Sequence, residues 1–418
     1  MRNFTFKGLL LTAVFMLLGC LSIQAANDDL ITKQITIKLD KAGTLPDRIA
    51  SSKKYKITNL KIIGEINGTD FRMIREMAGS DYYGGSTEGN LSVLDLSETK
   101  IVIGGGDCFN GYSCYTSNDV IGNRAFSGCS RLTSLTLPAS ITRIGDDAFC
   151  CCSGLTSLTL PAGITEIGYG AFWGCSGLTS LNLPAGITSI GDDAFYGCSG
   201  LTSITIPNGV TQIDKNAFYG CTGLTSLTLP ANIKRIGESA FKNCSGLTSL
   251  TLPAGITTIG SSAFYGCSGL TSLTIPDGVT KIGKYAFSNC SYLTSLTIPS
   301  SVNSLGDYAF KNCSSLQSVH VSWSTPISAG KAFNKADVSK CTLYVPQGTE
   351  QDYFLADVWG DFGNIVEYDP TGIDKVTTST DAKELSRYSV NGQRLATPTK
   401  GLNIVKYSDG SVKKVAVQ

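Results

Sequence analysis

Apolar and polar residues along the middle of the chain follow a pattern that returns at every 23rd position. An Ala-Phe pair marks the repeat ten times between Phe126 and Phe333, and no interval departs from this period. The unit that begins at Leu155 is LTSLTLPAGITEIGYGAFWGCSG. Within it, Leu158 and Leu160 lie on the same side of an extended segment, since side chains alternate between the two faces of a strand. The pattern therefore predicts one short strand, with one apolar face, in each coil.

The remainder of the unit predicts how each coil closes. Pro161 ends the strand, because proline has no N–H with which to continue a ladder. Gly168 permits a tight bend, and Ala171 and Phe172 are expected in a short helical turn. One coil cannot offset the entropy of ordering its own backbone, so neighbouring coils must stack. A period of this length lies in the leucine-rich-repeat range, and we predict a solenoid with a β-strand and a short helical turn per coil.

The sequence before the regular array predicts an irregular N-terminal cap. Residues 91–96 repeat the leucine spacing of residues 132–137 at an offset of 41, which corresponds to one coil plus an insertion. The glycine-rich stretch 104–118 is the expected place of that insertion. A divergent strand is predicted around Leu60, followed by a helix at about residues 71–77. We therefore assign residues 26–118 to the cap and residues 119–345 to the array.

The sequence after the array predicts a second cap and a separate tail. Residues 343–346 are expected to form the last strand, and residues 349–362 a helix that covers the open end. The C-terminal cap is thus predicted at 346–369. Residues 370–385 are polar and predict a linker. Residues 386–418 predict a small β-rich module, in which Asn391-Gly392 forms a hairpin turn.

Residues 1–25 have the features of a signal peptide. Basic residues flank the start, an apolar run follows from residue 9 to 18, and cleavage is expected after Ala25. Lipidation at Cys20 is the alternative, because Leu17-Leu18-Gly19-Cys20 approximates the lipoprotein motif. The apolar run is too short for a membrane span, and no later stretch qualifies. We expect a secreted protein or one on the outer cell surface.

The charge balance and the single histidine argue against several classes of function. The chain has 34 Lys and Arg against 33 Asp and Glu, so no strong field favours nucleic acid. His320 has no nucleophile paired to it by motif, which argues against a catalytic triad or a metal centre. The pairs Asp146-Asp147 and Asp192-Asp193 are expected in solvated turns. We predict no enzyme activity, no cofactor and no metal.

The chain has 15 cysteines, and nine of them share one register of the repeat. This cysteine column consists of Cys129, Cys152, Cys175, Cys198, Cys221, Cys244, Cys267, Cys290 and Cys313. Buried free thiols are the main prediction, with disulfides between adjacent coils or a metal site as alternatives. A local disulfide is predicted between Cys108 and Cys114, which are six residues apart. Cys150 and Cys151 break the consensus, and no function is assigned to them.

Two sets of outward residues are candidates for ligand binding. On the strand, a hydroxyl column consists of Thr159, Thr205, Thr228, Thr251 and Thr274, interrupted by Asn182. After the repeated phenylalanine, an aromatic stripe consists of Trp173, Tyr196, Tyr219 and Tyr265, interrupted by Lys242. A solvated sheet and packing between coils explain the two sets without any ligand. As contact surfaces they would suit glycans or proteins, because aromatic residues dominate binding hot spots.

Residues 119–345 resemble the BspA-like leucine-rich-repeat family through the motif L-T-S-L-x-[LI]-P-x-x-[IV]-x-x-I-G-x-x-A-F-x-x-C. The cap sequences NLKIIGEINGTDFRMIREMAG and CTLYVPQGTEQDYFLADVWGDFGNIVE look like those of Bacteroidales members. The resemblance implies an exported or surface protein, and some members of the family act as adhesins for host matrix proteins or other bacteria. The tail YSVNGQRLATPTKGLNIVKYSDGSVKKVAVQ resembles the type IX secretion sorting module, although it is shorter than usual.

These expectations combine into one predicted function and one alternative. The predicted function is recognition of an extracellular protein or glycoprotein ligand, with adhesion as its purpose. The alternative is a polysaccharide-binding or purely structural surface module without an adhesive role.

Overall fold

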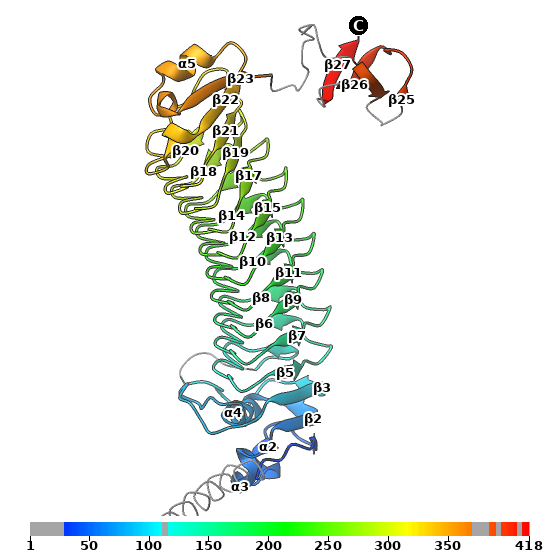
Figure 1. Cartoon of the computed structure of the whole chain (residues 1–418). Coiled ribbons are helices and arrows are strands. Elements are labelled where there is room, and N and C mark those ends of the chain that lie inside the picture. The colour runs from blue at the N-terminus through cyan, green and yellow to red at the C-terminus, as the bar shows by residue number, and fades with distance from the viewer. Residues whose placement is uncertain (1–28, 111–115, 370–383, 390–393, 408–411, 418) are drawn as a thin grey trace, which may run out of the picture.

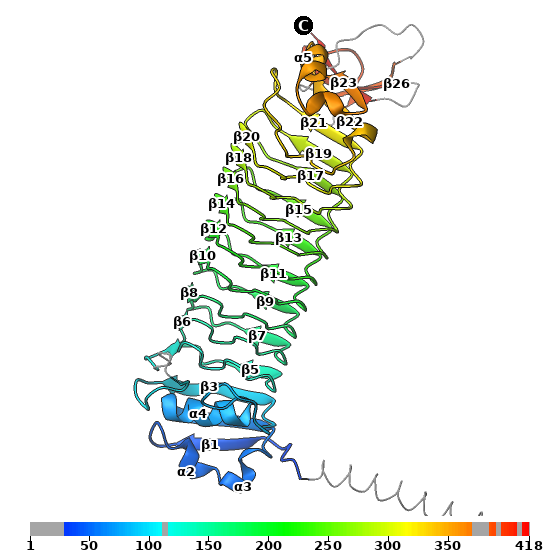
Figure 2. The same cartoon turned by 90° about the vertical axis from the view of Figure 1, so that its left-hand side faces the viewer.

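The structure of the protein is a computed structural model that describes residues 29–110, 116–369, 384–389, 394–407 and 412–417. The predicted signal peptide, Cys20, Cys114 and the turn at Asn391-Gly392 lie outside the described residues. From the first strand to residue 369 the chain winds into a parallel solenoid whose coils stack along one axis (Figures 1 and 2). The predicted leucine-rich-repeat solenoid is thereby confirmed.

Each regular coil contributes one strand to each of two ladders, which follow two sides of the stack (Figure 2). The first ladder consists of β1 (Ile35–Leu39), β2 (Asn59–Ile66), β3 (Val93–Ile101), β5 (Ser134–Thr136), β7 (Ser157–Thr159), β9 (Ser180–Asn182), β11 (Ser203–Thr205), β13 (Ser226–Thr228), β15 (Ser249–Thr251), β17 (Ser272–Thr274), β19 (Ser295–Ile298), β21 (Ser318–Val321), β22 (Thr342–Pro346) and β23 (Asn364–Tyr368). The second consists of β4 (Val120–Ile121), β6 (Arg143–Ile144), β8 (Glu166–Ile167), β10 (Ser189–Ile190), β12 (Gln212–Ile213), β14 (Arg235–Ile236), β16 (Thr258–Ile259), β18 (Lys281–Ile282) and β20 (Ser304–Leu305).

The register of the ladders follows the sequence period. Where strands of successive coils pair, they do so in parallel with equivalent residues opposite each other, as in the pairs of Ser134 with Ser157 and of Arg143 with Glu166. Strand pairing is interrupted between β11 and β13, between β15 and β17, and between β8 and β10. At the junction with the N-terminal cap, Leu94 of β3 pairs with Leu135 of β5. This pairing confirms the offset that the sequence predicts between the cap strand and the first regular strand.

The segment that closes each coil differs from the predicted short helical turn. In the coil of Phe172 the chain makes consecutive tight turns, and the backbone φ is positive at Gly170 and Gly174. The N–H of Phe172 donates to the carbonyl of Ala194 in the next coil at 2.9 Å. The N–H of Cys175 donates back to Phe172 at 3.1 Å. Because some N–H groups bond along the stack and others within the turn, no helix forms.

The repeated phenylalanines form a continuous column inside the stack. All ten, from Phe126 to Phe333, are buried, and neighbouring ring centroids lie 5.1 to 5.7 Å apart with ring planes within 18° of parallel. At the N-terminal end Phe71 meets Phe126 edge-on, at 5.4 Å and 76°. At the C-terminal end Trp359 meets Phe333 at 5.6 Å and 65°. An aromatic ring turned edge-on therefore ends this phenylalanine column at each cap.

The N-terminal cap covers its end of the stack with short helices: α2 (Leu45–Arg48), α3 (Ser51–Lys54) and α4 (Gly68–Met77). The start of α4 is fixed by a capping box between Asn67 and Asp70. The Asp70 carboxylate is fully buried and accepts hydrogen bonds from the backbone N–H groups of Asn67, Gly43 and Leu45, at 2.9, 2.6 and 2.9 Å. One side chain thus joins the helix to the preceding loop.

Replacing Asp70 by alanine is expected to destabilise the cap by about 2–4 kcal/mol, because it removes the capping box and leaves buried N–H groups without an acceptor. Urea unfolding followed by circular dichroism measures this change. Asp352→Ala is the matched control, since Asp352 is also in the first turn of a helix but is exposed at a helix start that has no side-chain cap. Equal effects of the two substitutions would contradict the assigned role of Asp70.

The C-terminal cap contains one strand more than predicted. β22 is not the last strand, because β23 pairs with it in parallel, with Leu343 opposite Ile365. Between them lie α5 (Glu350–Leu355) and the 3₁₀ turn η2 (Trp359–Asp361), a shorter helix than predicted, while η1 (Val338–Lys340) precedes β22. The Trp359 indole N–H donates to the Ile327 carbonyl at 2.7 Å. This bond fixes the buried indole at the end of the phenylalanine column.

The tail forms an antiparallel sheet of four strands, in the order β25, β24, β26, β27. The strands are β24 (Glu384–Ser389), β25 (Arg394–Leu395), β26 (Gly401–Tyr407) and β27 (Val412–Val417). β24 begins two residues before the predicted start of the tail at residue 386. The predicted β-rich character of the tail is confirmed.

Candidate ligand-binding surfaces

The outward residues of the three-residue strands form a polar surface, which we call the strand face. Thr159, Thr205, Thr228, Thr251 and Thr274 are all exposed, as are Asn182 and the serines two positions before them. The leucine or isoleucine between each serine and threonine points into the core. The structure therefore brings the predicted threonines together in one column on a single surface.

The strand face has a shallow depression where the threonine column is interrupted. β7 and β9 pair only at Ser157 and Ser180, so the register is not continued to Thr159 and Asn182. A depression of about 200 Å³ lies here, lined by both serines, Thr159 and Asn182. Its hydroxyl and amide groups can donate and accept hydrogen bonds, which suits a polar ligand.

A second set of threonines, which the sequence analysis did not identify, forms hydrogen bonds between successive coils. The Thr156 hydroxyl donates to the Thr133 carbonyl of the preceding coil at 3.2 Å, and Thr179 and Thr202 repeat this bond at 3.2 and 3.0 Å. Each of these threonines directly precedes the first serine of a strand, and this constant position is the sequence signal that could have identified them. These hydroxyls join successive coils and are not free for a ligand.

The aromatic stripe is a stack of half-buried rings on the turns that close the coils. The ring centroids of Trp173 and Tyr196 are 4.6 Å apart, and those of Tyr196 and Tyr219 are 4.5 Å apart. The ammonium group of Lys242 lies 5.4 Å from the Tyr219 ring centroid and 5.0 Å from that of Tyr265. The stripe is therefore continuous, because cation–π contacts bridge the interruption predicted at Lys242.

A further stacked pair, missed in the sequence, lies nearer the C-terminal cap. Tyr285 and Tyr308 stack at 5.0 Å, with Lys284 and Lys311 near their rings. They occupy the position before the Ala-Phe pair and have positive φ, which aromatic residues rarely adopt. In these two coils the position after phenylalanine holds Ser288 and Lys311, so the pattern that defines the aromatic stripe does not include the two tyrosines.

The two acidic pairs were predicted in solvated turns, but their side chains make more contacts with the protein than that prediction implies. The carboxylates of Asp146 and Asp192 each accept a backbone N–H of the next coil, at 2.9 and 2.8 Å. Asp147 forms an ion pair with Arg124 at 3.1 Å, and Asp193 is buried. Paired carboxylate chemistry is thus not favoured, because each of these carboxylates has a structural partner or is buried.

His320 belongs to an aromatic cluster at the C-terminal end of the strand face. Its ring stacks on Tyr344 at 4.2 Å and lies edge-on to Tyr368 at 5.7 Å. Burial lowers the pKa of His320 below its ordinary value, which favours the neutral ring at pH 7. Among the described residues, no group of three or more His, Cys, Asp or Glu side chains is placed to hold a metal ion.

The cysteine column consists of buried free thiols, as predicted. From Cys152 onwards, each Sγ–H donates to the phenylalanine carbonyl of the preceding coil, at 3.0 to 3.5 Å. Cys108 is disulfide-bonded and buried. Its predicted partner Cys114 lies outside the described residues, so that pairing stays a prediction.

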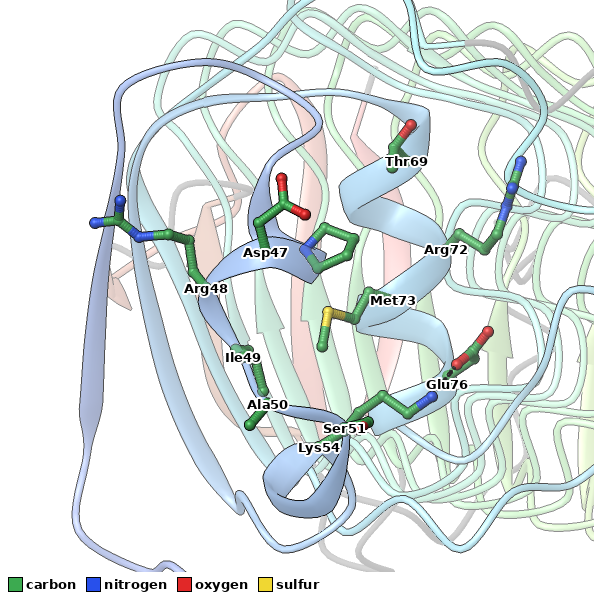
Figure 3. A pocket seen from close by; sticks show the side chains of 11 residues that line it. Asp47, Arg48, Ile49, Ala50, Ser51, Lys54, Thr69, Arg72, Met73 and Glu76 are labelled. Atoms are coloured by element: carbon green, nitrogen blue, oxygen red, sulfur yellow. Dashed lines mark hydrogen bonds and ion pairs between the residues drawn. The ribbon is translucent and has the colours of Figure 1, made fainter.

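A cavity with a volume of about 700 Å³ lies between α2, α3 and α4 in the N-terminal cap (Figure 3). Lys54 and Glu76 on its wall point toward each other and form an ion pair. The Arg72 guanidinium donates to the Asp107 carbonyl at 2.6 Å. Because these charged groups already bind protein atoms, we assign no ligand to the cavity.

The fold and its two outward surfaces define the class of the protein as a leucine-rich-repeat solenoid. The model of the BspA type leucine-rich repeat region, with six copies, matches residues 119–248 and 236–346. The matched residues, 119–346, are more than half of the 418-residue chain, and the chain belongs to this family. No protein of curated function matches the chain significantly.

Several solved structures are similar to the chain. A leucine-rich repeat protein from Bacteroides ovatus is 27% identical, with a TM-score of 0.42, over 55% of this chain and 64% of that one, less than two thirds of its length. A leucine-rich cell surface protein from Faecalibacterium prausnitzii is 24% identical over 81% and 91% of the chains, with a TM-score of 0.41. The pneumococcal vaccine antigen PcpA is 20% identical over 77% and 82%, with a TM-score of 0.45.

Proposed function

We propose that the protein is an exported recognition protein that binds an extracellular protein or glycoprotein through its aromatic stripe. The observation that carries this proposal is the stack of Trp173, Tyr196 and Tyr219, whose rings are only half-buried on the turns of the solenoid. Stacking holds the rings in place before a ligand arrives, so little side-chain entropy is lost on binding. Rigid aromatic side chains are also the most frequent binding hot spots.

The family and the described surfaces support a binding role rather than catalysis. Proteins built from leucine-rich repeats offer long surfaces for partners, and a surface location agrees with the family. Among the described residues, no helix is long and apolar enough to cross a membrane. The proposal includes export by residues 1–25, the division into caps, array, linker and tail, and a sorting role for the tail. Proteolysis of intact cells, followed by mass spectrometry, tests display and the mature ends together.

A polysaccharide ligand is the second candidate, and the depression at Thr159 and Asn182 is the observation that favours it. Hydroxyl and amide groups at regular spacing can bond sugar hydroxyls along an extended chain. A glycan array together with a panel of matrix glycoproteins separates the two candidates. Binding to glycans alone favours the strand face, whereas selective binding to matrix proteins favours the aromatic stripe.

The double substitution Trp173→Ala and Tyr196→Ala is expected to weaken ligand binding by at least about 30-fold, because one hot spot contributes about 2 kcal/mol. Surface plasmon resonance with the ligand from the panel measures the change. The matched control is Tyr285→Ala with Tyr308→Ala, which removes a stacked pair outside the stripe. If both doubles bind as the wild type does, the stripe serves only coil packing. Circular dichroism must show that each variant remains folded.

A further inference from the structure

One coil departs from the others at the two positions before its column cysteine. Cys150 occupies the position that Trp173 and Tyr196 hold in the aromatic stripe, and Cys151 occupies the position of Gly174. The same two positions hold Ser127 and Gly128 in the preceding coil and aromatic residues with glycine in the next three. The fold therefore requires no cysteine at either position.

The two side chains form a pair of neighbouring free thiols at the surface. The Cys150 thiol lies 3.6 Å from the Cys151 sulfur and donates its hydrogen to it. Cys151 is exposed, and Cys150 is half-buried. Cys151 also has a φ of 59°, in the left-handed region, where glycine is favoured and other side chains are strained. The backbone conformation at this position therefore disfavours the cysteine that occupies it.

This pair differs chemically from the cysteine column. The column thiols are buried and donate to backbone carbonyls, and burial raises their pKa, which keeps them protonated and unreactive. The hydrogen bond from Cys150 lowers the pKa of Cys151 to about 6. Cys151 is therefore largely a thiolate at neutral pH. The pKa of Cys150 is raised, first by the same bond and then by burial, so it remains the proton donor.

We propose that Cys150 and Cys151 form a reactive dithiol that exchanges with small extracellular disulfides. The Cys151 thiolate attacks one sulfur of a disulfide RS–SR, forms a mixed disulfide and releases RS⁻. The Cys150 thiol then loses its proton to the released thiolate or to solvent and attacks the Cys151 sulfur, which releases the second thiolate. Two protein thiols are oxidised to a disulfide between adjacent residues, and one small disulfide is reduced to two thiols.

A metal ion suits the pair less well than a disulfide does. A tetrahedral site requires three or four converging ligands, and no third ligand accompanies the pair among the described residues. The backbone N–H of Cys151 donates to the Trp173 carbonyl at 2.6 Å, so the dithiol adjoins the first ring of the aromatic stripe. The dithiol therefore lies beside the proposed binding surface. The exchange rests on the export included in the proposed function, but it does not require a ligand on the aromatic stripe.

The test uses the full chain, reduced and then treated with oxidised glutathione at pH 7. The reaction is quenched with iodoacetamide, and the peptides are mapped by mass spectrometry. A disulfide between Cys150 and Cys151 is expected in the folded protein. The thiols of the cysteine column are expected to be alkylated only after the protein is unfolded. Cys150→Ser is expected to accumulate the glutathione adduct on Cys151, because the resolving thiol is missing. Cys151→Gly is expected to lower the rate of fast alkylation at pH 7 at least about tenfold.

Both substitutions introduce residues that other coils already have at these positions, so the variants are expected to fold. The pH dependence of alkylation gives an independent readout: the midpoint for Cys151 is expected near pH 6 and is expected to rise in Cys150→Ser. The proposal is overturned if Cys151 stays fully alkylatable after oxidised glutathione. It is also overturned if Cys151→Gly alkylates as fast as the wild type.

Discussion

Replacing Phe218 by alanine is expected to lower the free energy of unfolding by about 3–5 kcal/mol, the loss typical of a buried phenylalanine. The Phe218 ring is fully buried, and its centroid lies 5.2 Å from that of Phe195 and 5.1 Å from that of Phe241. The substitution removes two ring–ring contacts and leaves a cavity between rings that cannot move together, since strand pairing fixes the spacing of the coils.

Urea unfolding followed by far-ultraviolet circular dichroism measures this loss. Phe354→Ala is the matched control, because the same atoms are removed from a phenylalanine that is 62% exposed on α5. Its effect is expected to stay within about 0.5 kcal/mol. A loss of less than about 1 kcal/mol for Phe218→Ala would show that the column contributes little to stability.

Raising the pH from 8 to 10 is expected to unfold the array. Burial raises the pKa of every thiol in the cysteine column, to about 11 for Cys129 and to about 12 for Cys198, Cys244 and Cys313. An unfolded thiol has a pKa of about 8.5. The stabilising effect is therefore fully present below pH ~8.5 and is lost as the pH rises toward the folded pKa, because only the unfolded state releases protons.

The size of this effect follows from the number of thiols. At pH ~9.5 each buried thiol lowers the free energy of unfolding by about 1.4 kcal/mol. The nine thiols of the column together lower the free energy of unfolding by on the order of 10 kcal/mol, which is comparable to the whole stability of an ordinary domain. Alkaline titration under reducing conditions, followed by circular dichroism, measures the midpoint.

The double variant Cys221→Ala and Cys244→Ala provides the control for the alkaline transition. Both thiols are buried and free, and their removal is expected to reduce the dependence of stability on pH by about 1.4 kcal/mol per thiol and pH unit. The slope of the free energy of unfolding against pH does not depend on how much the two substitutions destabilise the protein at pH 7. An unchanged slope would mean that other groups cause the alkaline transition.

The sequence predicted the features of the fold that depend on periodicity. A fixed period forces equivalent residues into register, which is why the phenylalanine column and the offset between Leu94 and Leu135 could be predicted from the sequence. The same reasoning predicted the exposed threonines and the buried thiols. In each case a residue contacts the equivalent residue of the neighbouring coil, so the repeat in the sequence also predicts the tertiary contact.

Features that depend on particular side-chain contacts could not be predicted in this way. The closing turns have the apolar spacing of a helix, but positive φ at Gly170 and Gly174 sends alternate N–H groups to the next coil. β23 has no repeat signature, and its place beside β22 follows from packing of the C-terminal cap. Lys242 looked like an interruption, since a sequence pattern does not show that its ammonium group lies between two rings.

The edge-on rings at the two caps have a consequence for how such a protein can change. Because Phe71 contacts Phe126 and Trp359 contacts Phe333, the number of coils between these two phenylalanines does not affect how the column ends. When a whole coil of 23 residues is inserted or removed, equivalent residues of the neighbouring coils still lie opposite each other. Each added or removed coil changes the length of the solenoid by about 5 Å and leaves the two ends of the phenylalanine column as they are. The length of such a solenoid can thus change in steps of one coil without a change in either cap.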